Sequence, residues 1–582
     1  MFLENVNSPK DVKKIKIEDL PTLCDEVRKA IINRISKRGG HIGPNLGVVE
    51  LTTALHYVFN SPVDKIVFDV SHQCYAHKIL TGRKYAYLND ELLNSVTGYT
   101  NPNESEHDFF TVGHTSTSIS LSLGLAYARD IKKEKDNIIA LIGDGSLSGG
   151  EALEALSTAG EYNNNLIIVV NDNEQSIAEN HGGLYNSLKE LRESNGASSN
   201  NIFKAFNLDY VYIDEGNDVI KLVNLFSKIK DINHPIVVHV HTLKGKGLKY
   251  AEIYKEKYHG GGPFNVEDGS PKFPYNHENI IHNLVMDLLK NDDKAFIINS
   301  ATPTVFEFYD ELRERLIKEG RYLDVGIAEE NAVAIASGAA KNGANVVYGT
   351  YAPFLQRTYD QLGHDLCLNN SPVTLLVVST GAYANKSNTH LSLNDIQIFA
   401  HLPNMVYLAP SNNEELVNMF KYATNQNNHP VAIRIPGRID YANIKDDTDY
   451  SKINKAKVIS RGRDAAIITF GPLLDLAREV RDELKNKYNK EISLISPMFL
   501  SGIDKELLEE LRKDHKLIIT MEDGYLEGGY GESIASYYGD SDMKVVNLGI
   551  SKHYHSEFNV DELLDENGMS LNKLIDVINK NL

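Results

Sequence analysis

The chain has 582 residues and a formal net charge of -19 at pH 7. It exceeds the length at which a single hydrophobic core stops growing, so roughly two to four domains are expected. Hydrophobic residues make up 42% of the chain and charged residues 24%, in the ordinary range for a globular protein. The negative charge argues against a duplex nucleic-acid partner, because no basic surplus is available to neutralise phosphates.

The cysteines and the apolar runs bear on the compartment. Cys24, Cys74 and Cys367 are too few and too scattered for a disulfide framework or a zinc site, which favours a reduced, cytoplasmic protein. The N-terminal residues lack the apolar core of a signal peptide, and no apolar run approaches the length that spans a bilayer. We therefore expect neither secretion nor a membrane partner.

Short apolar runs rich in β-branched residues alternate with helix-length segments along the chain. This pattern is typical of parallel sheets whose two faces are both covered by helices. The runs fall into three series, and we predict a strand in each of residues 65–70, 137–143, 166–170 and 235–242, then 295–300, 345–351, 373–380, 405–410 and 431–436, then 465–471, 491–497, 516–523 and 543–549.

Two stretches between these series are interpreted as linkers. Residues 259–276 concentrate Gly and Pro, and residues 444–455 are polar and charged. The sequence therefore predicts an α/β protein of three doubly wound domains with mostly parallel sheets, at residues 1–272, 273–445 and 446–582. In such sheets, ligands bind outside the carboxyl ends of the strands.

Gly143-Asp144-Gly145 follows one predicted strand, and Asn173 follows the next. A dinucleotide fingerprint would require a third glycine where Ser148 stands, and a P-loop would require a lysine that is missing. A tight turn in which Asp144 only caps a helix remains an alternative. The carboxylate of Asp144 and the amide oxygen of Asn173 are ligands suited to Mg²⁺, which usually shares its ligands with phosphates. A helix starting after Gly145 would direct free N–H groups to a diphosphate at the same place.

This arrangement resembles the diphosphate-anchoring motif of thiamine-diphosphate enzymes. The resemblance implies that the main-chain carbonyl of Gln175 is a third Mg²⁺ ligand beside Asp144 and Asn173. Longer blocks extend it over nearly the whole chain, and it is closest to the 1-deoxy-D-xylulose-5-phosphate synthases, a transketolase-like family. The blocks are residues 50–83, GHTSTSISLSLGLAYARD (113–130), NDNEQSIAEN (171–180), VGIAEENAV (325–333) and FLQRTYDQ (354–361).

The resemblance implies a homodimeric transferase that depends on thiamine diphosphate and Mg²⁺. Its reaction would be the decarboxylative condensation of pyruvate with D-glyceraldehyde 3-phosphate, whose product feeds isoprenoid, thiamine and pyridoxal phosphate synthesis. Glu329 would bond to the aminopyrimidine of the cofactor and favour the tautomer that removes the C2 proton; its neighbour Glu330 stands where the family usually has Gln. Phe354 would stack on the pyrimidine ring.

Further roles are implied by matching positions. His72 and His114 would lie along the cofactor, with His114 also acting in catalysis. His41 and His390 would act on the carbonyl and hydroxyl groups of the substrate, because imidazoles donate and relay protons near neutral pH. The remaining contacts to the cofactor would come from Gly113, Thr115, Gly145, Ser146 and Lys244, and contacts to the substrates from Tyr351, Arg357, Lys386 and Arg434.

The segment of residues 378–395 departs from the family. Ser379 replaces an arginine that grips the acceptor phosphate, and Lys386 replaces an aspartate that contacts acceptor hydroxyls. Losing a guanidinium from a phosphate site is not conservative. We hypothesise that Lys386 and Arg434 together hold the phosphate, although Lys386 is equally read as a solvated loop residue. The segment after residue 180 is also shorter than in the family.

These departures leave two other functions open. One is a divergent paralogue that uses another aldehyde acceptor or a ketose donor, as transketolase does. The other is a catalytically silent regulatory subunit, although the retained Asp144, Asn173, Glu329 and histidines count against it.

Overall fold

The computed structural model describes residues 1–273, 279–439 and 445–582. The chain forms two compact units, of which the first comprises Met1–His277 and Val325–Ala328, and the second Glu278–Asp324 and Glu329–Leu582. Among the described residues, no helix combines the length and the apolar character needed to cross a membrane.

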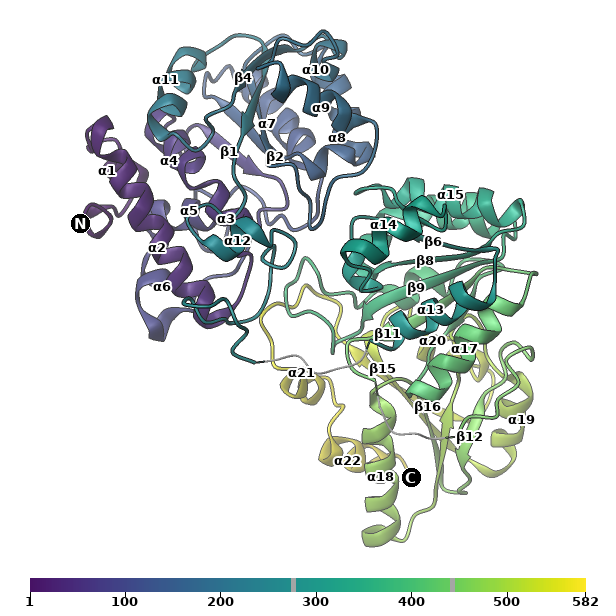
Figure 1. Ribbon diagram of the computed structural model, residues 1–582. Helices are drawn as coiled ribbons and strands as arrows, with labels where there is room; N and C mark the ends of the chain where they lie inside the picture. Colours follow the sequence, from purple (N-terminus) through teal and green to yellow (C-terminus); the bar gives the residue numbers. More distant parts are fainter. Residues whose placement is uncertain (274–278, 440–444) are drawn as a thin grey trace. The chain divides into compact units, whose positions relative to one another are not determined.

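The first unit is built on a five-stranded parallel sheet in the order β1-β2-β3-β5-β4. Its strands are β1 (Lys65–Phe68), β2 (Ile138–Gly143), β3 (Leu166–Asp172), β4 (Asp209–Ile213) and β5 (Pro235–His241). Alternate side chains of β2 and β3 enter two separate cores. One core contains residues of α2 (Leu20–Arg38), α4 (Val49–Val58) and α11 (Val219–Ile229), and the other contains residues of α7 (Ser118–Lys132), α8 (Gly150–Ala159) and α9 (Leu184–Glu193) (Figure 1). Both faces of the sheet are therefore covered, which leaves the strand ends for a ligand.

The second unit contains a six-stranded parallel sheet in the order β10-β11-β9-β8-β6-β7. Its strands are β6 (Ala295–Asn299), β7 (Tyr322–Asp324), β8 (Asn345–Tyr351), β9 (Val373–Thr380), β10 (Val406–Leu408) and β11 (Val431–Pro436). Apolar side chains of α13 (Ile280–Asn291) and α17 (Asn413–Asn425) share a core with this sheet. Helix α15 (Glu329–Lys341) begins at the residue predicted to activate the cofactor.

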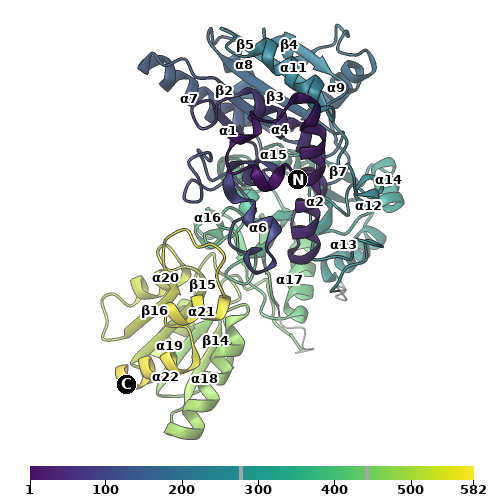
Figure 2. The ribbon, with the colours of Figure 1, turned by 90° about the vertical axis from the view of Figure 1, so that its left-hand side faces the viewer.

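The second unit also contains a five-stranded sheet in the order β12-β14-β13-β15-β16. Its strands are β12 (Lys457–Ser460), β13 (Ala465–Thr469), β14 (Ile492–Ser496), β15 (Leu517–Tyr525) and β16 (Lys544–Ile550). Only the edge strand β12 runs antiparallel to its neighbour among these described strands. Helices α18 (Leu473–Tyr488) and α22 (Leu571–Asn581) share one core with this sheet (Figure 2).

The predicted mostly parallel α/β fold is confirmed, and every strand predicted from an apolar run is present. The sequence missed β4, β7 and β12, each of which lies at the edge of its sheet. The predicted linkers fall partly outside the described residues, at 274–276 and 444. At the start of the first stretch, Gly261 forms an isolated bridge with Gly40. The three-domain boundaries stay a prediction.

Candidate functional site

A cluster of oxygen atoms lies where β2 and β3 end side by side. Gly143 pairs with Asn171 in the sheet, and the N–H of Asp144 donates to the carbonyl of Asn171 at 3.1 Å. Asn180 Nδ2 donates to Asp144 Oδ2 at 2.6 Å. The amide oxygens of Asn173 and Asn180 are buried and accept no hydrogen bond from any residue that the structure describes. The cluster thus combines one buried carboxylate with two uncommitted amide oxygens.

The electrostatics of the cluster favour a cation. Burial raises the pKa of Asp144 well above its usual value, and the negative charge of Asp172 raises it further. Burial also opposes ionisation of Asp172, but hydrogen bonds from His239 and Arg192 outweigh this effect and lower its pKa to about 2. A divalent ion would offset the cost of ionising Asp144. Oxygen donors of this kind match the preference of Mg²⁺, and Gln175 lies on the same loop.

The turn after β2 is closely packed. A Cβ atom on Gly145 would lie 2.8 Å from Cβ of Ser176, so a larger residue would displace the loop that carries Asn173. A helix was predicted directly after Gly145, but a single 3₁₀ turn, η5 (Gly145–Ser148), comes first and α8 begins at Gly150. Gly145 and Ser146 therefore lie in a 3₁₀ turn at the end of β2, and not in the first turn of an α-helix.

Asp69 fixes the loop that contains Gly113, His114 and Thr115. Asp69 is fully buried, and its two carboxylate oxygens accept hydrogen bonds from the backbone N–H groups of Ser116 and Ser118, each at 2.9 Å. Ser116 Oγ donates to the carbonyl of Ser146 at 2.8 Å. The loop predicted to contact the cofactor is thereby attached to the turn beside Asp144.

Three histidine rings gather in the first unit. The ring of His41 lies 5.2 Å from that of His72 and 5.8 Å from that of His259, and His72 stacks on His259 at 5.4 Å, measured between centroids. Asn45 joins two of their loops, because its Nδ2 donates to the carbonyls of His41 and His72 at 2.6 and 2.7 Å. His41 and His72 are thus brought together as predicted for residues of one site.

Burial disfavours the protonated forms of His41, His259 and the adjacent Lys244. Burial lowers the pKa of His41 to about 4 and that of His259 well below its usual value, and the nearby Lys244 lowers both further. Burial lowers the pKa of Lys244 itself to about 7. Lys244 Nζ donates to the carbonyl of Ser176 at 2.6 Å, and His259 Nδ1 lies 3.1 Å from the same oxygen. Of these three groups, Lys244 is the one whose pKa lies near neutral pH, whereas His41 and His259 are uncharged there.

The second unit carries the predicted glutamate in a buried position. Glu329, the first residue of α15, is 3% exposed, and burial raises the pKa of its carboxyl to about 7. Arg357 Nη1 lies 3.4 Å from Glu329 Oε2 and opposes that rise. A carboxyl with this pKa is present in both protonation states at neutral pH, which suits a proton-sharing role.

Aromatic rings lie around Phe354 in the same unit. The centroid of Phe354 is 5.7 Å from the ring of His390 and 6.1 Å from that of Tyr351. Thr389 Oγ1 lies 2.9 Å from His390 Nδ1, and the hydroxyl of Tyr351 lies 2.9 Å from Thr304 Oγ1. The structure thus gathers Phe354, His390 and Tyr351, which the sequence assigned to the cofactor, catalysis and the substrate.

Arg434 and Lys386 have different surroundings. Arg434 is 1% exposed and pairs with Asp395 at 2.7 Å and with Asp523 at 2.9 Å, while its Nη1 makes no hydrogen bond to a described residue. Lys386 is exposed. The two acidic partners balance the charge of Arg434, so its direct role towards a phosphate stays a prediction.

Three residues of these sites escaped the sequence analysis. His259 was assigned to a linker, although its place directly before three glycines signals a close backbone approach. Asn180 lies in a block that was recognised, but only Asn173 and Gln175 of that block were assigned. Asp69 lies within the predicted strand of residues 65–70 and directly follows the observed strand β1. Nothing in the local sequence distinguishes it from a solvated residue at the end of a strand.

Comparison with known proteins identifies the class and then the family. Profiles described as the pyrimidine-binding and C-terminal domains of transketolase match residues 279–439 and 454–574, which defines a transketolase-like protein. The profile described as 1-deoxy-D-xylulose-5-phosphate synthase matches residues 3–201. The chain is 36% identical over 606 residues to the 1-deoxy-D-xylulose-5-phosphate synthase of Clostridium beijerinckii, covering 97% of this chain and 96% of that protein. The chain therefore belongs to the 1-deoxy-D-xylulose-5-phosphate synthase family.

Other relatives give the same family. The 1-deoxy-D-xylulose-5-phosphate synthase of Caldanaerobacter subterraneus subsp. tengcongensis is 34% identical over 623 residues, which cover 99% of this chain and 98% of that protein. Among solved structures, a transketolase from Campylobacter jejuni is 17% identical with a TM-score of 0.44, and the match covers 97% of this chain and 100% of that chain.

Proposed function

We propose that the protein is a thiamine-diphosphate- and Mg²⁺-dependent transferase that condenses pyruvate with D-glyceraldehyde 3-phosphate, releasing CO₂ and forming 1-deoxy-D-xylulose 5-phosphate. The family to which the chain belongs supports the reaction. The oxygen cluster of the first unit and the buried glutamate of the second support the cofactor. The alternatives of another acceptor or of a silent subunit rest on the replacements at Ser379 and Lys386, and the comparisons do not support them.

The residues present fit the cofactor. Mg²⁺ would be held by Asp144, Asn173 and the carbonyl of Gln175, since the amide oxygen of Asn173 is buried and uncommitted. The diphosphate would contact the two closely packed loops, and the aminopyrimidine would contact Glu329 and Phe354. The residues proposed for the diphosphate side are His72, Gly113, His114, Thr115, Gly145, Ser146 and Lys244.

When bound, thiamine diphosphate supplies a carbon nucleophile that attacks a carbonyl and then stores the resulting negative charge. Glu329 holds a proton on its carboxyl next to that group, and its pKa of about 7 permits both uptake and release. His41, whose lowered pKa of about 4 keeps the ring neutral at pH 7, would accept a hydrogen bond from a substrate hydroxyl. His390 and His114 donate hydrogen bonds to substrate oxygens, where negative charge develops.

The single observation that carries the proposal is the unsatisfied oxygen cluster at the ends of β2 and β3. Buried polar atoms are nearly always hydrogen-bonded, so two orphaned amide oxygens beside a buried carboxylate require an explanation. A bound divalent ion explains Asp144 and Asn173, the two side chains proposed as its ligands, while Asn180 would orient the carboxylate of Asp144.

The test is an assay of CO₂ release and of product mass with pyruvate, thiamine diphosphate, Mg²⁺ and a panel of phosphorylated and plain aldehydes. The proposal expects product with glyceraldehyde 3-phosphate, and a fall of at least about 100-fold in turnover for Glu329→Gln. Turnover that is absent in wild type and variant alike would refute the enzymatic function. Efficient turnover with a different aldehyde would refute only the proposed acceptor.

The family resemblance and the cysteines bear on assembly and location. We infer a homodimer from the family resemblance, and light scattering coupled to size-exclusion chromatography tests it by the mass in solution. The three cysteines are buried and free, which fits a reducing cytoplasm.

A further inference from the structure

The segment of residues 379–397, here called the acceptor segment, leaves its sheet through an irregular turn. It carries Lys386 and His390 and joins the end of β9 to α16 (Asp395–Phe399). Ser379 and Gly381 have φ angles of 66° and 73°, in the left-handed region, and the register between β9 and β11 shifts next to them. Such a backbone persists only where surrounding contacts fix it.

Those contacts come from the C-terminal sheet of the same unit. The N–H of Ala382 donates to the carbonyl of Asp523 at 3.0 Å, and the N–H of Tyr525 donates to the carbonyl of Leu393 at 2.7 Å. The N–H of Glu557 donates to the carbonyl of Lys386 at 2.7 Å. The end of β15 and the loop after β16 thus hold the acceptor segment at its start, middle and end.

Gln397, in the middle of α16, adds a further link. Its Nε2 donates to the carbonyls of Tyr525 and Glu527, at 3.0 and 2.8 Å. These bonds connect α16 with the turn that follows β15.

A buried charge cluster lies beneath the segment. Arg434 Nε donates to Asp395 Oδ2 at 2.7 Å, and Arg434 Nη2 lies 2.9 Å from Asp523 Oδ1. Tyr407 also donates to Asp395, at 2.6 Å. A Cβ atom on Gly381 would lie only 2.0 Å from Asp523 Oδ2, so the backbone of the acceptor segment rests directly on this carboxylate.

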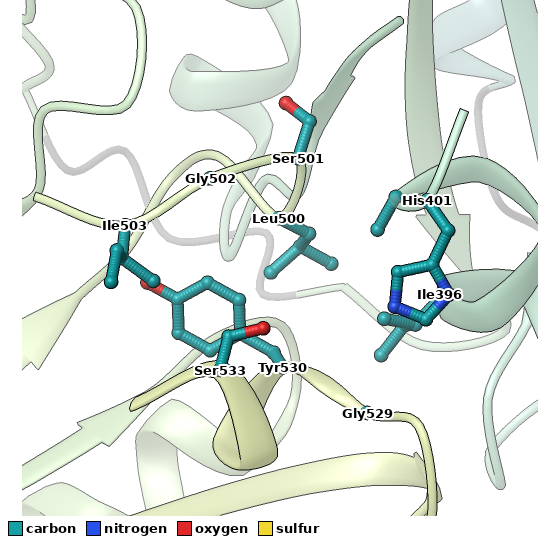
Figure 3. A pocket seen from close by; sticks show the side chains of 10 residues that line it. Ile396, His401, Leu500, Ser501, Gly502, Ile503, Gly529, Tyr530 and Ser533 are labelled. Carbon is teal, nitrogen blue, oxygen red and sulfur yellow. The ribbon is translucent and has the colours of Figure 1, made fainter. Parts of the chain in front are cut away.

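Packing next to this cluster is incomplete. A pocket of about 50 Å³ lies between α16 with its following loop and the C-terminal sheet. Figure 3 shows Ile396 and His401 on one side of it, with Ile503, Tyr530 and Ser533 on the other. Elsewhere, Ala382, Leu391 and Leu393 share a core with the C-terminal sheet, so apolar packing, hydrogen bonds and the charge cluster together connect the segment with that sheet.

We propose that Asp523 is a positioning residue for the acceptor substrate: it fixes the acceptor segment, and through it Lys386 and His390. This inference rests on the proposed function for the identity of the substrate. Through Asp523 the C-terminal sheet, which contributes none of the predicted site residues, determines acceptor binding without touching the acceptor.

The test compares Asp523→Asn with Asp540→Asn, which changes an exposed aspartate of the same sheet region. The chain contains no tryptophan, so Asn385→Trp places a single indole on the exposed part of the acceptor segment. In that background, Asp523→Asn should lower the fluorescence anisotropy of the indole, and Asp540→Asn should leave it unchanged. The apparent KM for the acceptor should rise about tenfold in Asp523→Asn, while the KM for pyruvate stays within about twofold.

A second variant covers the case in which Asp523→Asn does not fold. Gln397→Ala removes two hydrogen bonds to the C-terminal sheet and leaves the charge cluster intact, and should shift the anisotropy and the acceptor KM in the same directions. Unchanged anisotropy and unchanged acceptor KM in a folded variant would overturn the proposal. If the wild type showed no turnover but Asp523→Asn still lowered the anisotropy, the positioning of the segment would be supported and the proposed function would be refuted.

Discussion

The oxygen cluster of the first unit and the acceptor segment of the second are held by different kinds of contact. Residues of the same sheet and its loops fix the cluster, because Asp144 donates its N–H to Asn171 of β3 and accepts a hydrogen bond from Asn180. Residues from a neighbouring sheet fix the acceptor segment, chiefly Asp523. The oxygen cluster, which keeps the family motif, is therefore fixed by contacts within its own sheet and loops. The acceptor segment, which departs from the family, is fixed by residues of another sheet. Substitutions in the C-terminal sheet should therefore weaken binding of the acceptor more than binding of the cofactor.

The largest effect is expected from Asp144→Ala. Loss of the only carboxylate among the predicted Mg²⁺ ligands should weaken Mg²⁺-dependent binding of thiamine diphosphate by at least about 100-fold, equivalent to about 3 kcal/mol. Titration calorimetry with and without Mg²⁺ measures this. Glu174→Ala, which removes an exposed carboxylate from the same loop, is the matched control and should bind within about twofold of wild type. Equal affinity in Asp144→Ala and wild type would mean that the cluster is not the metal site.

Glu329→Gln should remove the pH dependence of stability that the buried carboxyl creates. A carboxyl whose pKa is about 7 in the folded protein, against an ordinary 4.5, destabilises the fold as pH rises between these values. Near pH 8 the variant should gain up to about 3 kcal/mol relative to wild type, and at about pH 4.5 almost nothing.

Urea unfolding near both pH values provides the measurement, with Glu330→Gln as the neighbouring control. A gain of equal size at both pH values would contradict the assigned pKa. Turnover should nevertheless fall, since the variant cannot share a proton.

Every apolar run predicted as a strand is present, because strands covered on both faces are continuously apolar and stand out in the sequence. β4, β7 and β12 were missed since edge strands are short or half-buried and lack such runs. The proximity of Asp144 and Asn173 was predictable because neighbouring parallel strands end at the same edge.

Long-range contacts explain what the sequence did not reveal. His259 joins His41 and His72 across more than 180 positions of the chain, and no local pattern encodes that approach. The two acidic partners of Arg434 likewise come from separate segments, so its motif alone suggested an available guanidinium. Local patterns indicate strand ends and loops, but not which side chains from distant segments neutralise one another there.

Lys386→Ala tests whether the acceptor segment itself contributes to binding of the acceptor phosphate. If this exposed lysine supplies the charge that the family's arginine provides, the acceptor KM should rise about tenfold and that of pyruvate should stay within about twofold. Steady-state kinetics with each substrate varied in turn measures both constants. Lys421→Ala, at another exposed lysine of the second unit, should change neither. An acceptor KM that does not move would leave Lys386 as a solvated loop residue.

The smallest effect is expected for the stability of Gln397→Ala. Its two hydrogen bonds to main-chain carbonyls are part-exposed and water replaces them, so the unfolding free energy should fall by about 1 kcal/mol. Affinity for thiamine diphosphate should be unchanged. Weakened cofactor binding in this variant would contradict the separation between the two regions.

The most direct test of the central claim is anomalous diffraction from crystals grown with thiamine diphosphate and Mn²⁺ in place of Mg²⁺. The account predicts one strong peak at about 2 Å from a carboxylate oxygen of Asp144 and from Oδ1 of Asn173, with the carbonyl of Gln175 and the diphosphate as further ligands. A fully occupied cofactor whose metal peak lies away from both side chains would contradict it.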